Sequence, residues 1–76
     1  MPVRIKVKEI AEHKGYSQGF LGRKANVDVR TMRKIYRDSR ASITLVVLGR
    51  LADALEVDAS ELIESVHDEH SDSQKD

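Results

Sequence analysis

The sequence predicts an all-α fold, a compact bundle of five helices, and three observations support this prediction. First, one helix-start signal occurs four times: an apolar residue, then Ser, Thr or Asp, then another apolar residue four positions further on. Second, the apolar residues after these signals repeat at the spacing of one helix face. Third, 76 residues with 39% apolar content suffice for one small core and no second domain.

The first helix is expected over residues 6–14. Val7, Ile10 and Ala11 share one helical face, and Gly15 favours the left-handed conformation that ends a helix. Residues 3–8 also alternate charged and apolar side chains, as a strand does. The opening residues therefore have a second interpretation, in which they run extended and pair with the edge of a partner molecule.

The other four helices are placed by their start signals. In each signal the polar side chain accepts a backbone N–H of the first turn, and the two apolar residues pack against each other. Asp58 with Glu61 adds a capping box. The signals are Tyr16, Ser17 and Leu21; Val27, Asp28 and Met32; Ile43, Thr44 and Leu48; and Val57, Asp58 and Leu62, which predict helices that begin near Gln18, Val29, Leu45 and Ala59.

The last two helices supply much of the predicted core. After Val66 the chain is polar and acidic, without periodicity. Residues 1–66 are therefore expected to form the domain, and residues 67–76 a disordered acidic tail. Helical spacing predicts a buried side made of Leu45, Leu48, Leu51, Ala52 and Leu55 in the fourth helix, and of Leu62 and Val66 in the fifth.

The second and third helices are separated only by Asn26 and Val27, so they must cross steeply. Gly22 supplies the small residue needed where their backbones meet, and Asn26 tolerates a left-handed turn. This is the pattern of a helix-turn-helix, whose second helix, here about residues 29–37, enters the major groove of DNA. The residues expected to face inward are Leu21, Ala25, Val27, Met32 and Ile35.

Four cations recur at helical spacing along the third helix: Arg30, Arg33, Lys34 and Arg37. Each like-charge neighbour three or four residues away costs a helix roughly 0.2 to 0.5 kcal/mol, so this stripe is best explained by a polyanion along that face. The whole chain has a net charge of zero, but its halves are opposites. Residues 1–40 carry eleven Lys and Arg against four acids, a net +7, and residues 41–76 carry two against nine, a net −7.

Two blocks, SQGFLGRKANVDVRTMRKIY from Ser17 and LVVLGRLADALEVDASELI from Leu45, resemble the Cro and phage-repressor type (XRE-like) of helix-turn-helix DNA-binding domain. The resemblance covers most of the chain, and a tyrosine followed by a basic residue is similar to a short, single-domain bacterial subgroup. It implies a lambda-repressor-like DNA-binding fold. The chain departs from the usual pattern at Gly22, Asn26, Tyr36 and Asp38.

The resemblance also implies roles for individual residues. Val29, Arg30 and Lys34 match base-contacting positions, with Arg33 beside them, and Arg30 suits guanine while Val29 suits a thymine methyl. For Asp28 the role of helix cap is preferred over that of a residue that contacts cytosine. The residues expected to meet phosphates are Gln18 at the start of the second helix, then Arg37 and Arg40, with Arg33 as a further candidate.

Other chemistry is not indicated. The chain lacks a cysteine nucleophile, a glycine-rich phosphate loop and a serine with a placed base, so we do not expect an enzyme. His67, Asp68, Glu69 and His70 lie in the tail without a fixed third ligand group, and His13 is better interpreted as a helix-dipole partner. We expect no metal, cofactor or small-molecule ligand. No run is apolar enough to span a membrane, and the absence of cysteine fits a cytoplasmic protein.

Taken together, these features predict a transcriptional regulator that binds double-stranded DNA in a sequence-specific way. A homodimer on two half-sites one turn apart is expected, because one such module reads few base pairs. Its contact would use Ile63, Val66 and Val46, or pairing of the strand-like residues 3–5. The alternative is a protein-interaction module, an antitoxin or adapter on the same scaffold, whose partner is an acidic protein.

Overall fold

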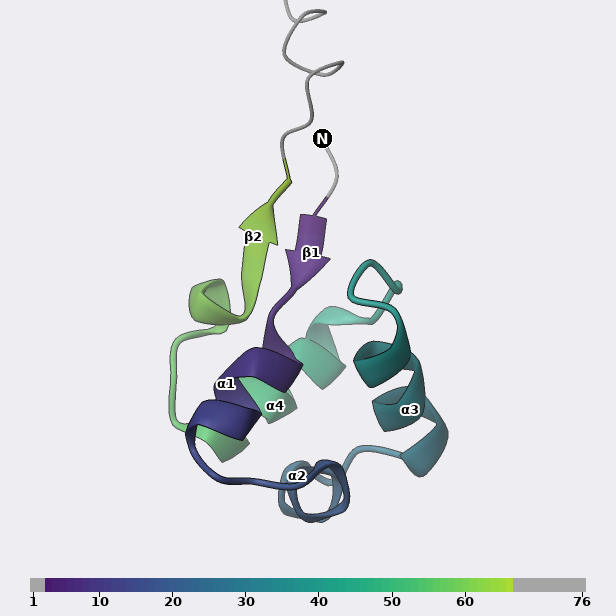
Figure 1. Ribbon diagram of the computed structural model, residues 1–76, viewed down its shortest axis with the longest axis vertical. Coiled ribbons are helices and arrows are strands. Elements are labelled where there is room, and N and C mark those ends of the chain that lie inside the picture. The colour runs from purple at the N-terminus through teal and green to yellow at the C-terminus, as the bar shows by residue number, and fades with distance from the viewer. Residues whose placement is uncertain (1–2, 67–76) are drawn as a thin grey trace, which may run out of the picture.

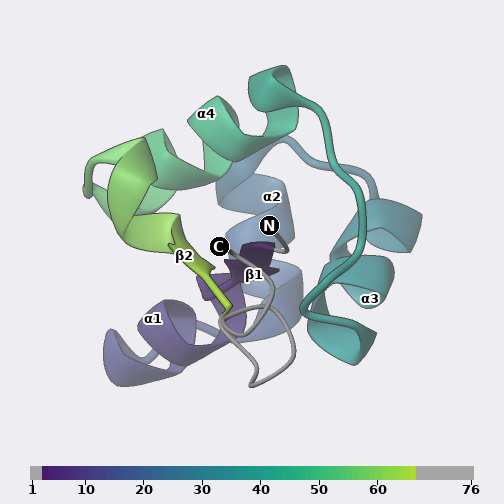
Figure 2. The same cartoon turned by 90° about the horizontal axis from the view of Figure 1, so that it is seen from above.

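The computed structural model describes residues 3–66, which form a mostly helical fold closed by a small two-stranded sheet (Figure 1). Seen from above in Figure 2, the four α-helices surround the strands, and α2 packs against both α3 and α4. No helix in the described part is long and apolar enough to cross a membrane. In chain order the elements are β1 (Val3–Ile5), α1 (Val7–His13), α2 (Gln18–Ala25), α3 (Val29–Arg37), α4 (Leu45–Leu55), the 3-10 helix η1 (Ala59–Leu62) and β2 (Ile63–Ser65).

All four predicted caps are present. Each cap side chain accepts a backbone N–H of the first turn, which would otherwise lack a partner. At the last start Asp58 and Glu61 complete the capping box. Gly15 has a φ of 81°, which confirms the predicted left-handed end of α1. The cap bonds run from Phe20 N–H to Ser17 Oγ (3.1 Å), from Arg30 N–H to Asp28 Oδ2 (2.9 Å), from Val47 N–H to Thr44 Oγ1 (3.1 Å) and from Ser60 N–H to Asp58 Oδ2 (3.0 Å).

The prediction of a fifth α-helix was wrong. The capping box starts a single 3-10 turn, η1, and the chain then extends as β2, which pairs antiparallel with β1. One turn is enough to bury Leu62 completely, and the Lys6 N–H donates to the Leu62 carbonyl oxygen at 2.7 Å. The extended interpretation of residues 3–5 was therefore right about the strand, but its partner lies in the same chain. The paired residues are Val3 and Ser65, Arg4 and Glu64, and Ile5 and Ile63.

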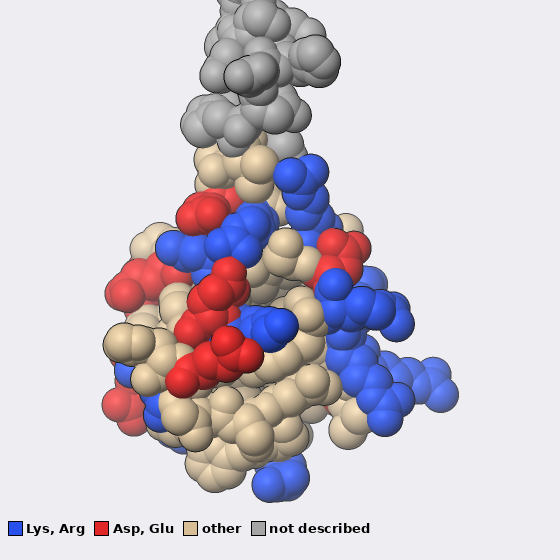
Figure 3. Space-filling model, viewed as in Figure 1, with Lys and Arg blue, Asp and Glu red and all other residues tan. Residues whose placement is uncertain are grey.

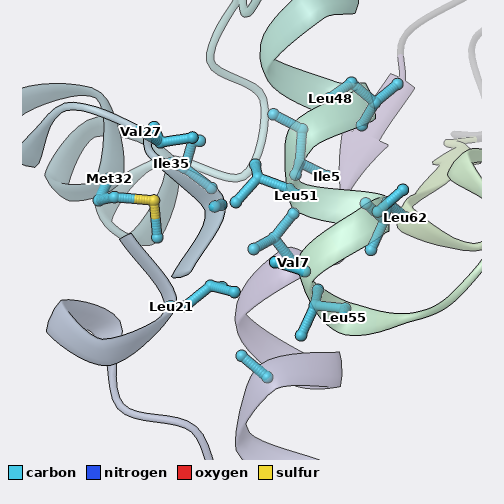
Figure 4. Close-up of a cluster of buried hydrophobic side chains, with 14 residues drawn as sticks. Ile5, Val7, Leu21, Val27, Met32, Ile35, Leu48, Leu51, Leu55 and Leu62 are labelled. Carbon is cyan, nitrogen blue, oxygen red and sulfur yellow. The ribbon is translucent and has the colours of Figure 1, made fainter. Parts of the chain in front are cut away.

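The core lies between the helices and the inner side of the sheet, as the close-up in Figure 4 shows. Every buried side chain among the described residues is apolar. The predicted inward-facing residues of α2 and α3 are all buried, as are Leu48, Leu51, Ala52 and Leu55 of α4. The fourteen members are Ile5, Val7, Ala11, Leu21, Ala25, Val27, Met32, Ile35, Leu48, Leu51, Ala52, Ala54, Leu55 and Leu62.

Two residues of the predicted core lie elsewhere. Leu45 is 82% exposed, because it is the first residue of α4 and its side chain extends beyond the start of the helix, where nothing packs over it. Val66 follows the end of β2 and is only half-buried. Its expected place on a helical face was wrong because the chain there is not helical. The predicted tail, residues 67–76, lies outside the described residues.

Candidate nucleic-acid interface

The turn between α2 and α3 is fixed by backbone geometry. Asn26 has a φ of 59°, the left-handed conformation expected for it, and the Val27 N–H donates to the Gly22 carbonyl oxygen at 2.9 Å. From α4, Arg50 Nη1 donates to the Asn26 carbonyl oxygen at 3.3 Å. The turn is thus tied to α2 on one side and to α4 on the other, which sets the angle at which α3 leaves the fold.

Gly22 allows the close approach of α2 and α3. A Cβ atom at this position would lie 3.1 Å from Met32 Cγ and 3.5 Å from the Val27 carbonyl oxygen. The contact brings Met32 into the core, where it is 2% exposed, and Ile35 one turn later is equally buried. The apolar side of α3 is therefore held against the body of the fold, and its opposite side faces outward.

The outward side of α3 carries the four cations predicted from the sequence. Arg30, Arg33, Lys34 and Arg37, which we call the cationic face of α3, are all exposed. Within residues 3–66 none of them lies within 4.0 Å of a carboxylate. Figure 3 shows a dense group of Lys and Arg on the side of the molecule where α3 lies, with an acidic patch beside it, while most of the visible Asp and Glu lie over the other side among further cations. The self-repelling stripe is thus left without an ion-pair partner among residues 3–66.

Cations near the sheet are arranged in the opposite way. Arg4 Nη1 lies 2.6 Å from Glu9, Arg4 Nε lies 3.0 Å from Glu64, and Lys6 Nζ lies 3.8 Å from Glu64. Hydrogen bonds to Glu64 and Glu9 raise the pKa of Arg4. Partial burial acts to raise the pKa of Glu9, but hydrogen bonds from its own backbone N–H and from Arg4 outweigh it and lower the pKa. Arg4 and Lys6 therefore contribute little to the positive field of the molecule.

The predicted residues at the starts of α2 and α3 line one groove of about 480 Å³. Gln18 lines it from α2, and Val29, which is 61% exposed, lines it from the start of α3. Asp28 also lines the groove, with its carboxylate engaged as the cap of α3. Arg23 lines the same groove and sequence reasoning did not single it out. No local sequence signal marked it, because its place in the groove depends on where α2 meets α3.

Beyond α3, Arg40 lies in the loop that leads to α4. It is exposed, and its backbone N–H donates to Asp38 Oδ1 at 3.0 Å, which closes the turn after the helix. The structure thus places Arg40 past the C-terminal end of the cationic face and Gln18 beside its N-terminal end. No group of three or more potential metal ligands occurs in residues 3–66, and the His67 to His70 cluster lies outside that range.

Comparison with known proteins gives one family match. The model of the Cro/C1-type HTH DNA-binding domain matches residues 6–68, which include α1 to α4, η1 and β2. No curated protein and no solved structure matches the chain. The matched segment contains the left-handed turn, the close α2 and α3 packing and the exposed cations described above. The chain belongs to the Cro/C1-type helix-turn-helix DNA-binding domain family.

Proposed function

We propose that this protein binds double-stranded DNA in a sequence-specific way, with α3 in the major groove, and regulates transcription. The observation that carries the proposal is the cationic face of α3, exposed and without a carboxylate partner in residues 3–66, on a helix whose reverse side is buried. Such a helix repels itself unless a polyanion lies against it. A nucleic-acid backbone supplies a dense row of negative charge.

The individual roles follow the positions along α3. Arg30, in the first turn, donates to O6 and N7 of a guanine, and Val29 contacts a thymine methyl group. Lys34 lies one turn further along the same face and reaches a base edge. Arg33, placed beside this row, contacts a base or the adjacent phosphate. Arg37 at the end of α3, Gln18 at the start of α2 and Arg40 in the loop contact phosphates, which set the register of the helix without reading sequence.

A homodimer is the simplest way for this domain to reach useful specificity. Two copies related by a two-fold axis would read two half-sites one helical turn apart. The apolar side chains still exposed for such a contact include Val46, at 63%, beside Leu45 at 82%. Pairing through β1 is less available than the sequence indicated, because β1 is already bonded to β2 and, through the Ile5 N–H, to the Ser39 carbonyl oxygen at 2.6 Å.

The test begins with selection of bound sites from a random duplex pool. Binding to the selected duplex should weaken with salt, by about 0.9 in log K per unit log salt for each neutralised phosphate. Arg37→Gln should lower this slope by about 0.9 on every duplex. Arg30→Gln should lose roughly 1 to 3 kcal/mol of preference for the selected base over its substitutes.

Lys14→Gln is the matched control, because Lys14 is an exposed cation directly after α1 and away from the cationic face. It removes the same charge and should leave base preference unchanged. Equal losses on all duplexes from Arg30→Gln and Arg37→Gln would contradict base reading by Arg30. Absence of salt-dependent duplex binding would reject the proposal and favour an acidic protein as the partner.

A further inference from the structure

We infer that the cationic face of α3 is also the docking surface of the chain's own acidic C-terminal segment, residues 67–76, which competes with DNA for it. The competition with DNA rests on the proposed function, whereas the docking of the segment on α3 does not. The segment holds four acidic residues against one lysine, a net charge of −3. Its charge is therefore opposite to that of a helix face that has no carboxylate partner within residues 3–66.

Four of the other cations in the described part already have contacts of their own. On the sheet, Arg4 and Lys6 bind Glu9 and Glu64. Lys24 Nζ donates to the Tyr16 hydroxyl at 3.2 Å and lies 4.9 Å from the centre of the Tyr16 ring. Arg50 donates to the Asn26 carbonyl oxygen. The row of cations on α3, continued by Arg40, is the largest set of Lys and Arg side chains in the described part without such contacts.

The path of the chain makes the docking geometrically possible. Ser65 pairs with Val3, and two residues along β1 the Ile5 N–H is bonded to Ser39, which lies just beyond the end of α3. At about 3.3 Å per strand residue and about 5 Å between strands, Ser65 lies roughly 10 to 15 Å from that loop. Ten extended residues span up to about 33 Å. The nine residues of α3 are only about 14 Å long, so the segment can run along the whole cationic face.

Intramolecular docking would reduce DNA affinity because only the molecules with an uncovered α3 can bind DNA. If the segment covers α3 in about nine molecules of ten, the apparent Kd for DNA is about tenfold higher than that of the uncovered domain. The competition is electrostatic, so it should be strong at low salt and absent near 1 M salt, where the Debye length falls to about 3 Å. The factor is the same for every duplex, because a molecule whose α3 is covered binds none of them.

The direct test uses the full chain without DNA. The chain contains no cysteine, so Ser73→Cys places a single nitroxide label in the segment. At about 50 mM salt we expect the label to broaden the backbone amide NMR signals of α3 more than those of α4, and the effect to disappear near 1 M salt. Adding Glu69→Gln and Asp72→Asn should weaken the broadening. Equal broadening of α3 and α4 at low salt would overturn the proposal whatever the DNA measurements show.

The second test measures affinity with a charge-matched control. Glu69→Gln with Asp72→Asn removes two acidic charges from the segment. Glu56→Gln with Asp53→Asn makes the same two changes at the exposed end of α4, away from α3 in Figure 1. At low salt the first variant should bind duplex about three- to tenfold more tightly than the second. Equal affinities would overturn the competition. A chain that binds no duplex would refute the proposed function, while the label experiment would still decide the docking.

Discussion

Replacing Tyr36 with phenylalanine is expected to stabilise the fold. Tyr36 lies on α3 with its ring packed against the core, and its hydroxyl oxygen is buried without a hydrogen-bond partner among the residues that the structure describes. Tyr36→Phe removes only this oxygen and keeps the ring. The substitution therefore isolates the free energy of one unpaired polar group on the helix that presents the candidate interface.

The magnitude follows from the burial of the hydroxyl. A buried polar group left unpaired costs about 1 to 3 kcal/mol. The residue as a whole is half-buried, so the low end applies, and Tyr36→Phe should raise the free energy of unfolding by about 1 kcal/mol. For a domain of this size such a change corresponds to a rise in Tm of about 4 to 8 °C.

The same environment predicts a dependence on pH. Burial and, to a smaller extent, the Glu12 carboxylate raise the pKa of Tyr36 above its ordinary value of 10.0. The folded state therefore holds the phenolic proton more tightly than the unfolded state. Stability from this group is complete below the unfolded pKa and is lost as the pH rises through the folded one. The advantage of Tyr36→Phe over the unsubstituted protein should thus grow above pH 10.

Urea denaturation at pH 7 and at pH 10.5 provides the measurement. Tyr16→Phe is the control, because the Tyr16 hydroxyl accepts a hydrogen bond from Lys24 and its loss should bring no gain in stability. If Tyr36→Phe instead lowers the free energy of unfolding at pH 7, the hydroxyl has a partner, such as an ordered water, and the reasoning from an unpaired group fails.

Three further outcomes are expected. Asp28→Ala should lower the free energy of unfolding by about 1 kcal/mol through loss of the α3 cap, whereas Asp28→Asn keeps a cap acceptor and should change thermal stability little. Glu56→Gly should raise stability in urea titrations by about 0.5 kcal/mol, because Glu56 has a φ of 60° that favours glycine; a loss would show that its side chain makes a needed contact. Hydrogen bonds from the Ser60 hydroxyl and N–H lower the pKa of Asp58, so the stability that this carboxylate contributes is present above its ordinary pKa of 3.8 and should be lost as pH falls through the folded value. In acid unfolding followed by circular dichroism, Asp58→Asn should therefore lose less stability over this pH range than the unsubstituted protein.

Local signals explain most of what was predictable. A cap acts within three residues and a buried helix face repeats within four, so the starts of α2, α3 and α4 and the α2 to α3 turn could be predicted from neighbouring residues alone. The end of the chain required information from far away. Glu64 pairs with Arg4 across 60 residues of sequence, and no local pattern indicates that Ile63 to Ser65 will extend instead of continuing a helix.

Periodicity has a second limit, which Leu45 illustrates. Spacing gives the angle of a side chain around its helix but not its position along the axis relative to neighbouring elements. Leu45 and Leu48 lie on the same side of α4, yet Leu48 is 8% exposed and Leu45 is 82% exposed. The neighbouring elements cover the helix at Leu48 but do not reach Leu45. The same limit applied to Arg23, whose place in the groove with Gln18 depends on where α2 meets α3.

The structure adds most to the sequence analysis in showing which charges are paired and which are not. Counting gives residues 1–40 a net charge of +7, but it treats Arg4 and Arg33 alike. Pairing of the strands brings Glu64 onto Arg4 and Lys6, whereas the packing of Met32 and Ile35 turns the cations of α3 outward, with no carboxylate of the described part within 4.0 Å. Charges held within a few ångströms of a counter-charge produce little field at a distance, and unpaired ones produce most of it. α3 gathers four of these unpaired cations on one exposed face, so approach to a polyanion would present the helix that carries the base-reading candidates.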